Sequence, residues 1–117
     1  MYYKSDFDLD LSTGQTGENT VQNLLNIETV EVKTDFMAAQ TGNLAIEFES
    51  RGFQSGIAVT KAEYWAFLIP DKSLIMIKTD RLKELARKYF KKGSVVKGGD
   101  FNSSRIILIP IKEAVHG

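Results

Sequence analysis

The chain has 117 residues, which is the size of one compact domain with one hydrophobic core. It contains no cysteine, so disulfide bonds, thiolate metal ligands and a cysteine nucleophile are excluded. No apolar run approaches the roughly 20 residues that span a bilayer, and the acidic N-terminus does not resemble a secretory signal. We therefore expect a single cytoplasmic domain over 1–117 with no membrane partner.

Opposite charges cancel over the whole chain but not within its halves. Residues 1–50 hold two lysines and nine acidic residues, a net charge of −7, whereas residues 51–117 hold thirteen basic and six acidic residues, a net charge of +7. Such a split predicts an acidic cluster and a basic surface on one fold. A nuclease needs both features, but two halves that simply attract each other would show the same pattern.

The chain is expected to begin with an extended arm and a short helix. Residues 1–11 alternate aspartates with apolar side chains, as an edge strand or an ordered arm does. A helix then follows, in which Val21, Leu24 and Leu25 form the apolar stripe.

Two strands are predicted next, at about 28–36 and 43–51. Each would have one apolar face and one ionic face, because alternate side chains of a strand point to opposite sides. Gly42 and Asn43 favour a turn between them, so we expect an antiparallel hairpin.

The second half is richer in regular structure. Its predicted elements, in order, are a short helix and a buried strand within 60–70, a strand at 74–78, a helix over 79–93 and a strand at 105–111. The buried strand runs through Trp65, Phe67 and Ile69. The buried stripe of the helix over 79–93 is formed by Leu82, Leu85, Ala86 and Tyr89. Thr79 is a suitable N-cap for that helix and Gly93 a natural stop, whereas Pro110 indicates that the last strand lies at an edge or ends there. This order predicts an α/β or α+β fold, a single mixed sheet with flanking helices.

The ionic face of the predicted hairpin is a candidate metal site. Crowded carboxylates repel one another, and a hard divalent cation such as Mg²⁺ neutralises them. We expect Asp35 and Glu47 to be cross-strand neighbours, with Glu18 reaching the same place from the helix. Lys33 would orient an attacking water or stabilise charge on a phosphate. A solvated sheet face with cross-strand ion pairs is the alternative interpretation.

Five segments, "DFDLDL…GQTGE", "VEVKTD", "TGNLAIEFESRG", "SGIAVTKAEYWAF" and "VVKGGDFNSSRIILIPIKE", resemble a set of small phage-encoded proteins. Those proteins are similar to the PD-(D/E)XK, or restriction-endonuclease-like, nucleases. The resemblance implies a helix with a glutamate, then a hairpin with an aspartate on one strand and (D/E)-x-K on the next. It therefore implies a restriction-endonuclease-like core for the domain.

Two alignments with that pattern are open, and element order favours the first. In it, Glu18 is the helix acid and Asp35 the strand aspartate. The segment from Glu47 to Glu49 then takes the (D/E)-x-K place, although Glu49 stands where lysine is usual. This departure puts the activation of water in doubt.

In the second alignment, Glu31 and Lys33 themselves spell the (D/E)-x-K motif. The aspartate must then lie upstream, where only Asp6, Asp8 and Asp10 are available. These three precede the predicted helix, which does not agree with the order of elements that the resemblance implies.

The resemblance implies a Mg²⁺- or Mn²⁺-dependent DNA endonuclease, or a nuclease-like protein, that hydrolyses phosphodiester bonds in the host cytoplasm. A non-catalytic phage protein that binds DNA or protein with the same fold is the alternative. Dimerisation would let so small a chain cover both DNA strands. The expected catalytic residues are the metal ligands Glu18, Asp35 and Glu47, with Lys33, Glu31 and Glu49 in supporting roles.

A basic cluster late in the chain is the expected DNA-binding surface, because lysines and arginines neutralise phosphates. The candidates are Lys61, Arg87, Lys88, Lys91, Lys92 and Lys97. Phe101, in the polar loop that follows, would either stack on a base or lie buried under the loop, and we expect it to be buried.

Overall fold

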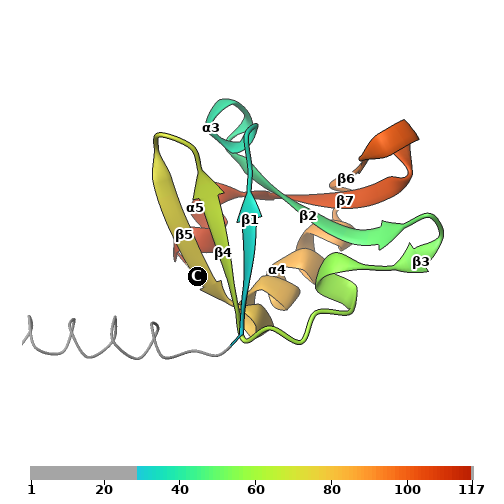
Figure 1. The fold of residues 1–117 in the computed structure, drawn as a ribbon, viewed down its shortest axis with the longest axis horizontal. Coiled ribbons are helices and arrows are strands. Elements are labelled where there is room, and N and C mark those ends of the chain that lie inside the picture. Colours follow the sequence, from blue (N-terminus) through green and yellow to red (C-terminus); the bar gives the residue numbers. More distant parts are fainter. Residues whose placement is uncertain (1–28, 117) are drawn as a thin grey trace, which may run out of the picture.

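The computed structural model describes residues 29–116, which form an α+β fold with two sheets and three helices (Figure 1). The predicted arm and first helix, including Glu18, lie outside the described residues. The elements in chain order are β1 (Val30–Thr34), α3 (Ala38–Thr41), β2 (Asn43–Ser50), β3 (Phe53–Gln54), the 3-10 turn η1 (Gly56–Ala58), β4 (Tyr64–Ile69), β5 (Ser73–Lys78), α4 (Thr79–Lys91), β6 (Val95–Gly98), the 3-10 turn η2 (Asp100–Asn102), β7 (Ser104–Pro110) and α5 (Ile111–His116).

The strands divide between two sheets, so the prediction of a single mixed sheet is wrong. One sheet has the order β1-β4-β5, with β1 parallel to β4 and β5 antiparallel to it. The other is antiparallel and has the order β3-β2-β7-β6. The expected hairpin of the first two strands is also wrong, because β1 and β2 belong to different sheets.

Local and long-range interactions together explain why that hairpin does not form. The segment before Gly42 forms the helical turn α3, and Gly42 ends it in a left-handed conformation with a φ of 72°. Beyond that turn, Leu44 and Ile46 of β2 are fully buried and lie in register with Ile109 and Ile107 of β7. The apolar side chains of β2 therefore pair with those of β7, which lies far along the chain, rather than with those of β1.

Strand β4 carries the largest core side chains, as its alternation predicted. Trp65, Phe67 and Ile69 are buried, and they belong to the same hydrophobic cluster as Ile107 and Leu82. The short helix expected just before this strand is absent from the described structure. The 3-10 turn η1 precedes it instead, and the segment between them is irregular.

The predicted amphipathic helix is confirmed as α4. Leu82, Leu85 and Ala86 are buried on its inner face, as the spacing predicted, whereas Tyr89 of the same predicted stripe is only partly buried. Thr79 is the first helical residue and Lys78 is the N-cap, so the predicted cap is wrong; the Thr79 hydroxyl instead donates a hydrogen bond of 2.6 Å to the carbonyl of Ala62. Gly93, with a φ of 80°, follows the last turn, so the predicted stop is correct.

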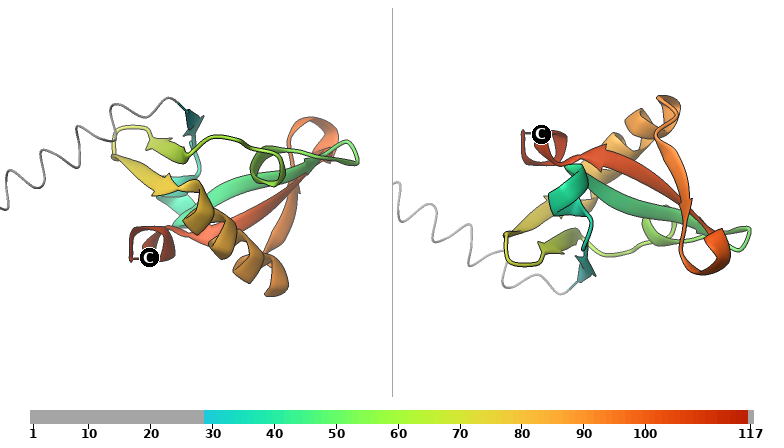
Figure 2. Two further views of the ribbon diagram at one scale, coloured as in Figure 1. Left: turned by 90° about the horizontal axis from the view of Figure 1, so that it is seen from below. Right: turned by 90° about the horizontal axis from the view of Figure 1, so that it is seen from above.

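Helix α4 lies across one face of the four-stranded sheet, in front of it in the left view of Figure 2 and behind it in the right view. Its contacts with β7 are the most extensive that it makes with any single element of the described chain. Strand β7 lies inside the sheet and ends at Pro110, so the proline marks a strand end rather than an edge. Among the described residues, no helix is long and apolar enough to cross a bilayer.

Candidate nucleic-acid interface

The carboxylate of Asp35 accepts hydrogen bonds from the backbone of the segment that connects the two sheets. Its Oδ1 accepts hydrogen bonds from the backbone N–H of Met37 at 3.2 Å and of Ala38 at 3.0 Å, so it caps the turn α3. Its Oδ2 accepts a third bond of 3.0 Å from the backbone N–H of Ala45. Both oxygens are therefore occupied by neutral backbone donors.

The carboxylate of Glu47 is held by two serine hydroxyls. Ser104 donates to its Oε1 at 2.8 Å, and Ser55 donates to its Oε2 at 2.9 Å. These bonds connect the middle of β2 to the start of β7 and to the segment before η1. Gly56, next to Ser55, lies so close to the backbone carbonyl of Glu47 that a Cβ atom would clash with it.

The remaining predicted site carboxylates pair with cations close to them. Glu31 contacts Lys33 on β1 at 3.4 Å, and the ammonium of Lys33 lies 5.7 Å from the ring centroid of Trp65. Glu49 contacts Arg105 on β7 at 3.3 Å. Both pairs are partly exposed, so each is expected to contribute little to stability.

The predicted metal ligands therefore do not form a metal site within residues 29–116. No group of three or more histidine, aspartate or glutamate side chains in this range is placed to hold a metal ion. Asp35 and Glu47 already accept five hydrogen bonds between them, and the third expected ligand, Glu18, lies outside the described residues. The described carboxylates alone do not fit a Mg²⁺ or Mn²⁺ ion, which requires free oxygen ligands.

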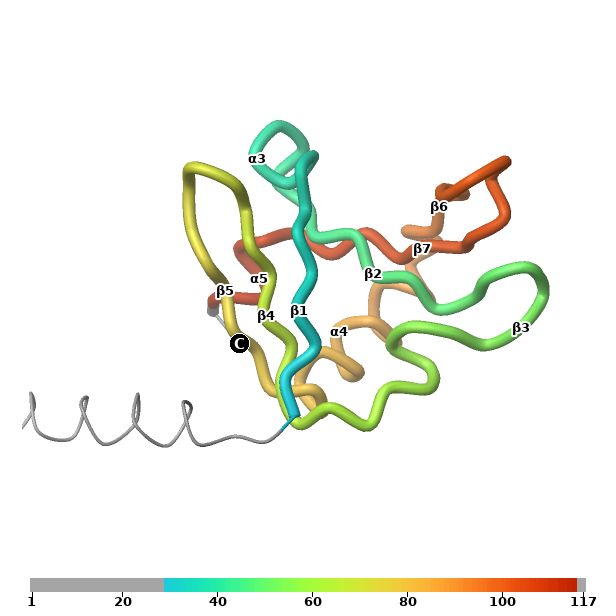
Figure 3. Tube along the Cα trace, in the orientation of Figure 1, coloured from blue at the N-terminus to red at the C-terminus, as the bar shows by residue number. Residues whose placement is uncertain are grey.

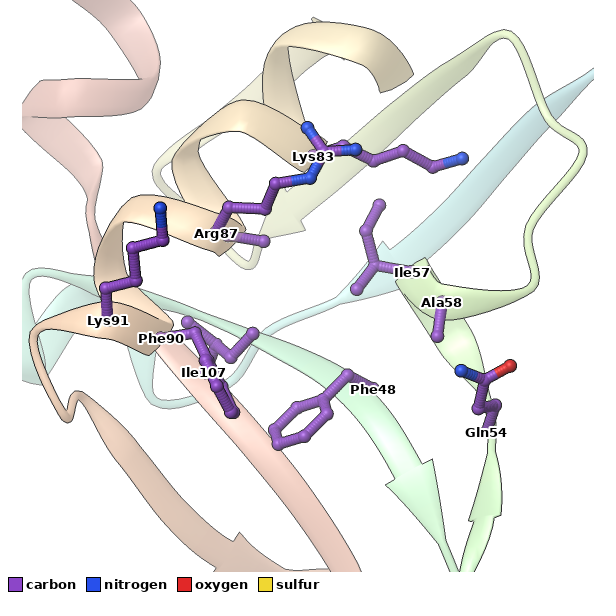
Figure 4. A pocket seen from close by; sticks show the side chains of 10 residues that line it. Phe48, Gln54, Ile57, Ala58, Lys83, Arg87, Phe90, Lys91 and Ile107 are labelled. Carbon is purple, nitrogen blue, oxygen red and sulfur yellow. The ribbon is translucent and has the colours of Figure 1, made fainter.

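The structure does bring part of the predicted basic cluster to a groove of about 380 Å³, which we call the basic groove. It lies between α4 and the turn η1, and Figure 4 shows side chains of the two elements facing each other across it. Phe48 from β2 and Phe90 from α4 form its aromatic wall, with ring centroids 5.6 Å apart in an edge-to-face arrangement. Phe90 keeps 46% of its surface exposed, so an aromatic surface remains open to solvent.

Three cations on α4 line this groove: Lys83, Arg87 and Lys91. They are four residues apart, so they lie on one side of the helix about 6 Å from one another along its axis. None of the three forms an ion pair with another residue of the range 29–116. Lys83 was not among the predicted contacts, although its spacing from Arg87 would have indicated it.

Two more cations extend the positive surface onto the sheet. The guanidinium carbon of Arg105 lies 5.0 Å from the ring centroid of Phe48, in cation–π geometry. Lys97 of β6 is the cross-strand partner of Arg105 and so lies on the same face of the sheet. Ile107, two residues after Arg105, lines the groove and belongs to this face as well.

The other predicted contacts lie apart from the basic groove. Lys88 forms an ion pair of 2.7 Å with Glu113 of α5, and Tyr89 donates a hydrogen bond of 3.1 Å to the same carboxylate oxygen. These contacts lower the pKa of Glu113 and raise that of Lys88, chiefly through the hydrogen bond between them. Lys92 lies 5.1 Å from the Tyr89 ring, and Lys61 is exposed on the segment before β4.

One groove of this α+β domain thus combines an aromatic wall with three cations that have no ion-pair partner among residues 29–116. No protein-family model, curated protein or solved structure matches this chain.

Proposed function

We propose that this protein binds single-stranded nucleic acid in the basic groove. The observation that carries the proposal is that Lys83, Arg87 and Lys91 line the same groove as the rings of Phe48 and Phe90. Proteins that bind single strands combine a positive groove that follows the backbone with aromatic side chains on which bases stack. Both components are present here: the cations come from α4, and the two rings come from β2 and α4.

The arrangement suits an unpaired strand better than a duplex. The bases of a duplex are stacked and paired, so their faces are not free to stack on the rings of Phe48 and Phe90. An unpaired base exposes both faces and is small enough for a groove of about 380 Å³. The repeat of about 6 Å along α4 is also close to the separation of successive phosphates in an extended strand.

Charge complementarity supports a polyanionic ligand over an apolar one. Lys83, Arg87 and Lys91 form no ion pair within residues 29–116, so a phosphate would not have to displace a carboxylate of this range from them. Arg105 of β7 differs from these three cations, because Glu49 already contacts it. We therefore assign phosphate contacts first to the α4 cations and only second to Arg105.

Fluorescence anisotropy of labelled oligonucleotides tests this proposal. We expect salt-sensitive binding of oligothymidylate, with each neutralised phosphate contributing about −0.7 to the slope of log K against log salt. Lys91→Ala should weaken binding and make this slope less steep by about 0.7. The matched control is Lys72→Ala, which removes the same charge from the exposed β4–β5 turn and should change neither quantity.

Two further measurements define the ligand. Phe90→Ala should weaken binding by about 1–3 kcal/mol, the usual contribution of one stacked base. Oligouridylate in place of oligothymidylate distinguishes RNA from DNA, since both present the same phosphates and free base faces. Binding that Lys91→Ala and Lys72→Ala weaken equally would reduce the interaction to general charge attraction and contradict the proposal.

Metal-dependent hydrolysis of DNA, which the resemblance implies, stays a separate prediction. It requires plasmid nicking in Mn²⁺ or Mg²⁺ that EDTA abolishes, and it needs a ligand beyond Asp35 and Glu47. Salt-sensitive retention of DNA with no cleavage under any metal would leave the non-catalytic alternative.

A further inference from the structure

The three-stranded sheet has one face that is apolar and exposed, which we call the apolar sheet face. Alternate side chains of a strand share a face, and Val32, Ala66 and Met76 lie opposite one another on β1, β4 and β5. Two residues further along β4, and on the same face, Leu68 lies opposite Leu74. Four of these five side chains, all except the alanine, keep between 36% and 63% of their surface exposed.

The opposite face of the same sheet belongs to the hydrophobic core. It carries Trp65, Phe67 and Ile77, which are all buried. Ile111 of α5 packs against the same cluster, and both views of Figure 2 show α5 on one side of the sheet. Figure 3 shows β1, β4 and β5 side by side, so the apolar sheet face is a continuous surface over the three strands.

The strand sequences are typical of a sheet that is covered on both faces. The chain reads YWAFLI over β4 and LIMI within β5, whereas a strand with one solvated face alternates apolar and polar residues. A contiguous apolar patch usually marks a contact surface.

Single exposed apolar side chains, in contrast, are common on protein surfaces. Phe101 is one of them, and the prediction that it lies buried under its loop is wrong. The turn η2 gives its backbone a left-handed conformation, with a φ of 57°, and leaves its ring in solvent.

The first 28 residues join the described fold at the edge of the apolar sheet face. The carbonyl of Thr29, just before β1, accepts hydrogen bonds from the backbone N–H of Glu63 at 3.1 Å and of Tyr64 at 3.4 Å. Tyr64 and its cross-strand partner Lys78 belong to this same face. Because strands of six residues are only about 20 Å long, a segment that enters here needs no long linker to cross the face.

The predicted helix before β1 matches the face in size and in polarity. Val21, Leu24 and Leu25 form its apolar stripe. A helix of about ten residues is about 15 Å long and about 10 Å wide, and three strands are about 10 Å across. One such helix would therefore cover most of the apolar sheet face.

Charge complementarity favours the same segment. Residues 1–28 hold one lysine and five acidic residues, a net charge of −4. Lys78 ends β5, and Lys72 immediately precedes that strand, so a cation lies at each end of it. A second copy of the described domain would bring the same cations to the face and gain no such attraction.

We propose that the segment around Val21, Leu24 and Leu25 packs on the apolar sheet face of its own chain. The covalent connection through Thr29 gives this segment a high effective concentration at the face, which a separate partner lacks. Residues of the three-stranded sheet do not line the basic groove, so this packing does not depend on nucleic-acid binding.

Thiol reactivity in the full chain tests this packing, because the chain contains no cysteine and one introduced thiol reports on one position. Leu68→Cys and Val96→Cys are matched, since the two side chains are 43% and 41% exposed in the described structure. We expect Leu68→Cys to react with dithionitrobenzoate at least about 10-fold more slowly than Val96→Cys, because a covered thiol reacts only when the cover opens. Each rate is divided by that of the same variant unfolded in urea.

A second substitution then identifies what covers the thiol. Leu24→Asp should raise the rate of Leu68→Cys to within about 2-fold of the Val96→Cys rate, because a buried charge prevents the packing. Asn23→Asp adds the same charge on the other side of the predicted helix and should leave the reaction slow. The fluorescence of buried Trp65 checks that the domain is folded. If Leu24→Asp unfolds it, Leu24→Ala replaces that variant and should accelerate the reaction by about 3-fold or more.

Three outcomes would overturn the proposal in distinguishable ways. Equal rates for Leu68→Cys and Val96→Cys would show that the apolar sheet face is open in solution. Protection that appears only at high protein concentration would assign the face to a second copy of the chain. Protection that neither Leu24→Asp nor Leu24→Ala reduces would mean that this part of the chain does not cover the face.

Discussion

The carboxylate of Asp35 accepts a hydrogen bond of 3.0 Å from the backbone N–H of Ala45, ten residues further along the chain. The residue that follows β1 thereby fixes the start of β2, and the same carboxylate caps the turn between the two strands. A residue that the sequence marked as a metal ligand thus has a structural function that requires no metal.

Asp35→Ala is expected to destabilise the fold in the absence of divalent ions. The change removes the acceptor of three backbone N–H groups, and the loss of a capping side chain or a hydrogen-bond acceptor usually costs about 1–3 kcal/mol. Urea unfolding followed by the fluorescence of Trp65, which is the only tryptophan and is buried, measures this loss. Unchanged stability in EDTA, together with the loss of a Mn²⁺-dependent rise in melting temperature, would indicate a metal ligand instead.

Glu47→Ala is expected to destabilise the protein by about 1–3 kcal/mol, because it leaves two serine hydroxyls without an acceptor. Glu47→Gln should cost less, since the amide oxygen still accepts one of these bonds. A double-mutant cycle of Glu47→Ala with Ser104→Ala, measured by urea unfolding, should give a coupling energy clearly different from zero. Additive effects would show that the hydrogen bond at 2.8 Å contributes nothing to stability.

Gly56→Ala should be more destabilising than Gly52→Ala. Both glycines have positive φ values, 50° and 83°, so alanine strains the backbone at either site by about 1–2 kcal/mol. At Gly56 the added Cβ would also clash with the backbone carbonyl of Glu47, whereas nothing lies within 4 Å of a Cβ at Gly52. Equal midpoints of urea unfolding for the two variants would mean that η1 moves away from β2 at no cost.

The contact between α4 and α5 should make stability depend on pH. The pKa of Glu113 is lowered by Lys88 and Tyr89, so its contribution is complete above the unfolded pKa and is lost as the pH falls through the folded one. The pKa of Lys88 is raised by Glu113, so that contribution is lost as the pH rises through the folded pKa.

We therefore expect the difference in urea midpoint between wild type and Glu113→Gln to be largest near neutral pH. It should shrink below a pH of about 4 and again above about 10. Arg81→Gln is a suitable control, because its pair with Glu84 lies within α4 and does not connect two elements. A difference that stays constant from pH 3 to neutrality (about the range in which glutamate titrates) would show that the ion pair does not contribute.

Local sequence patterns were sufficient to predict those helices and strands whose buried residues recur at a regular spacing. The spacing of Leu82, Leu85 and Ala86 predicted α4, and the alternation of Trp65 and Phe67 predicted β4, because each periodicity requires one geometry. Gly93 likewise marked the end of α4, since few other residues adopt its left-handed conformation.

Which strands pair with one another could not be predicted from local patterns in the same way. The charges on β1 and β2 predicted a hairpin, yet β1 pairs with β4 and β2 pairs with β7. Nothing local in the segment from Asp35 to Gly42 distinguishes a tight turn from a change of sheet. The apolar partners of Leu44 and Ile46 that decide the question lie more than 60 residues away, on β7.

For the basic groove too, the sequence determined some features and only the tertiary structure determined the others. By itself, the sequence determined that the second half is basic and that α4 has a charged outer surface. Only the tertiary structure placed Lys83, Arg87 and Lys91 opposite Phe48 while turning Lys88 toward Glu113. The physical reason is that charge and periodicity are properties of the local chain, whereas a binding surface depends on which distant side chains the core brings together.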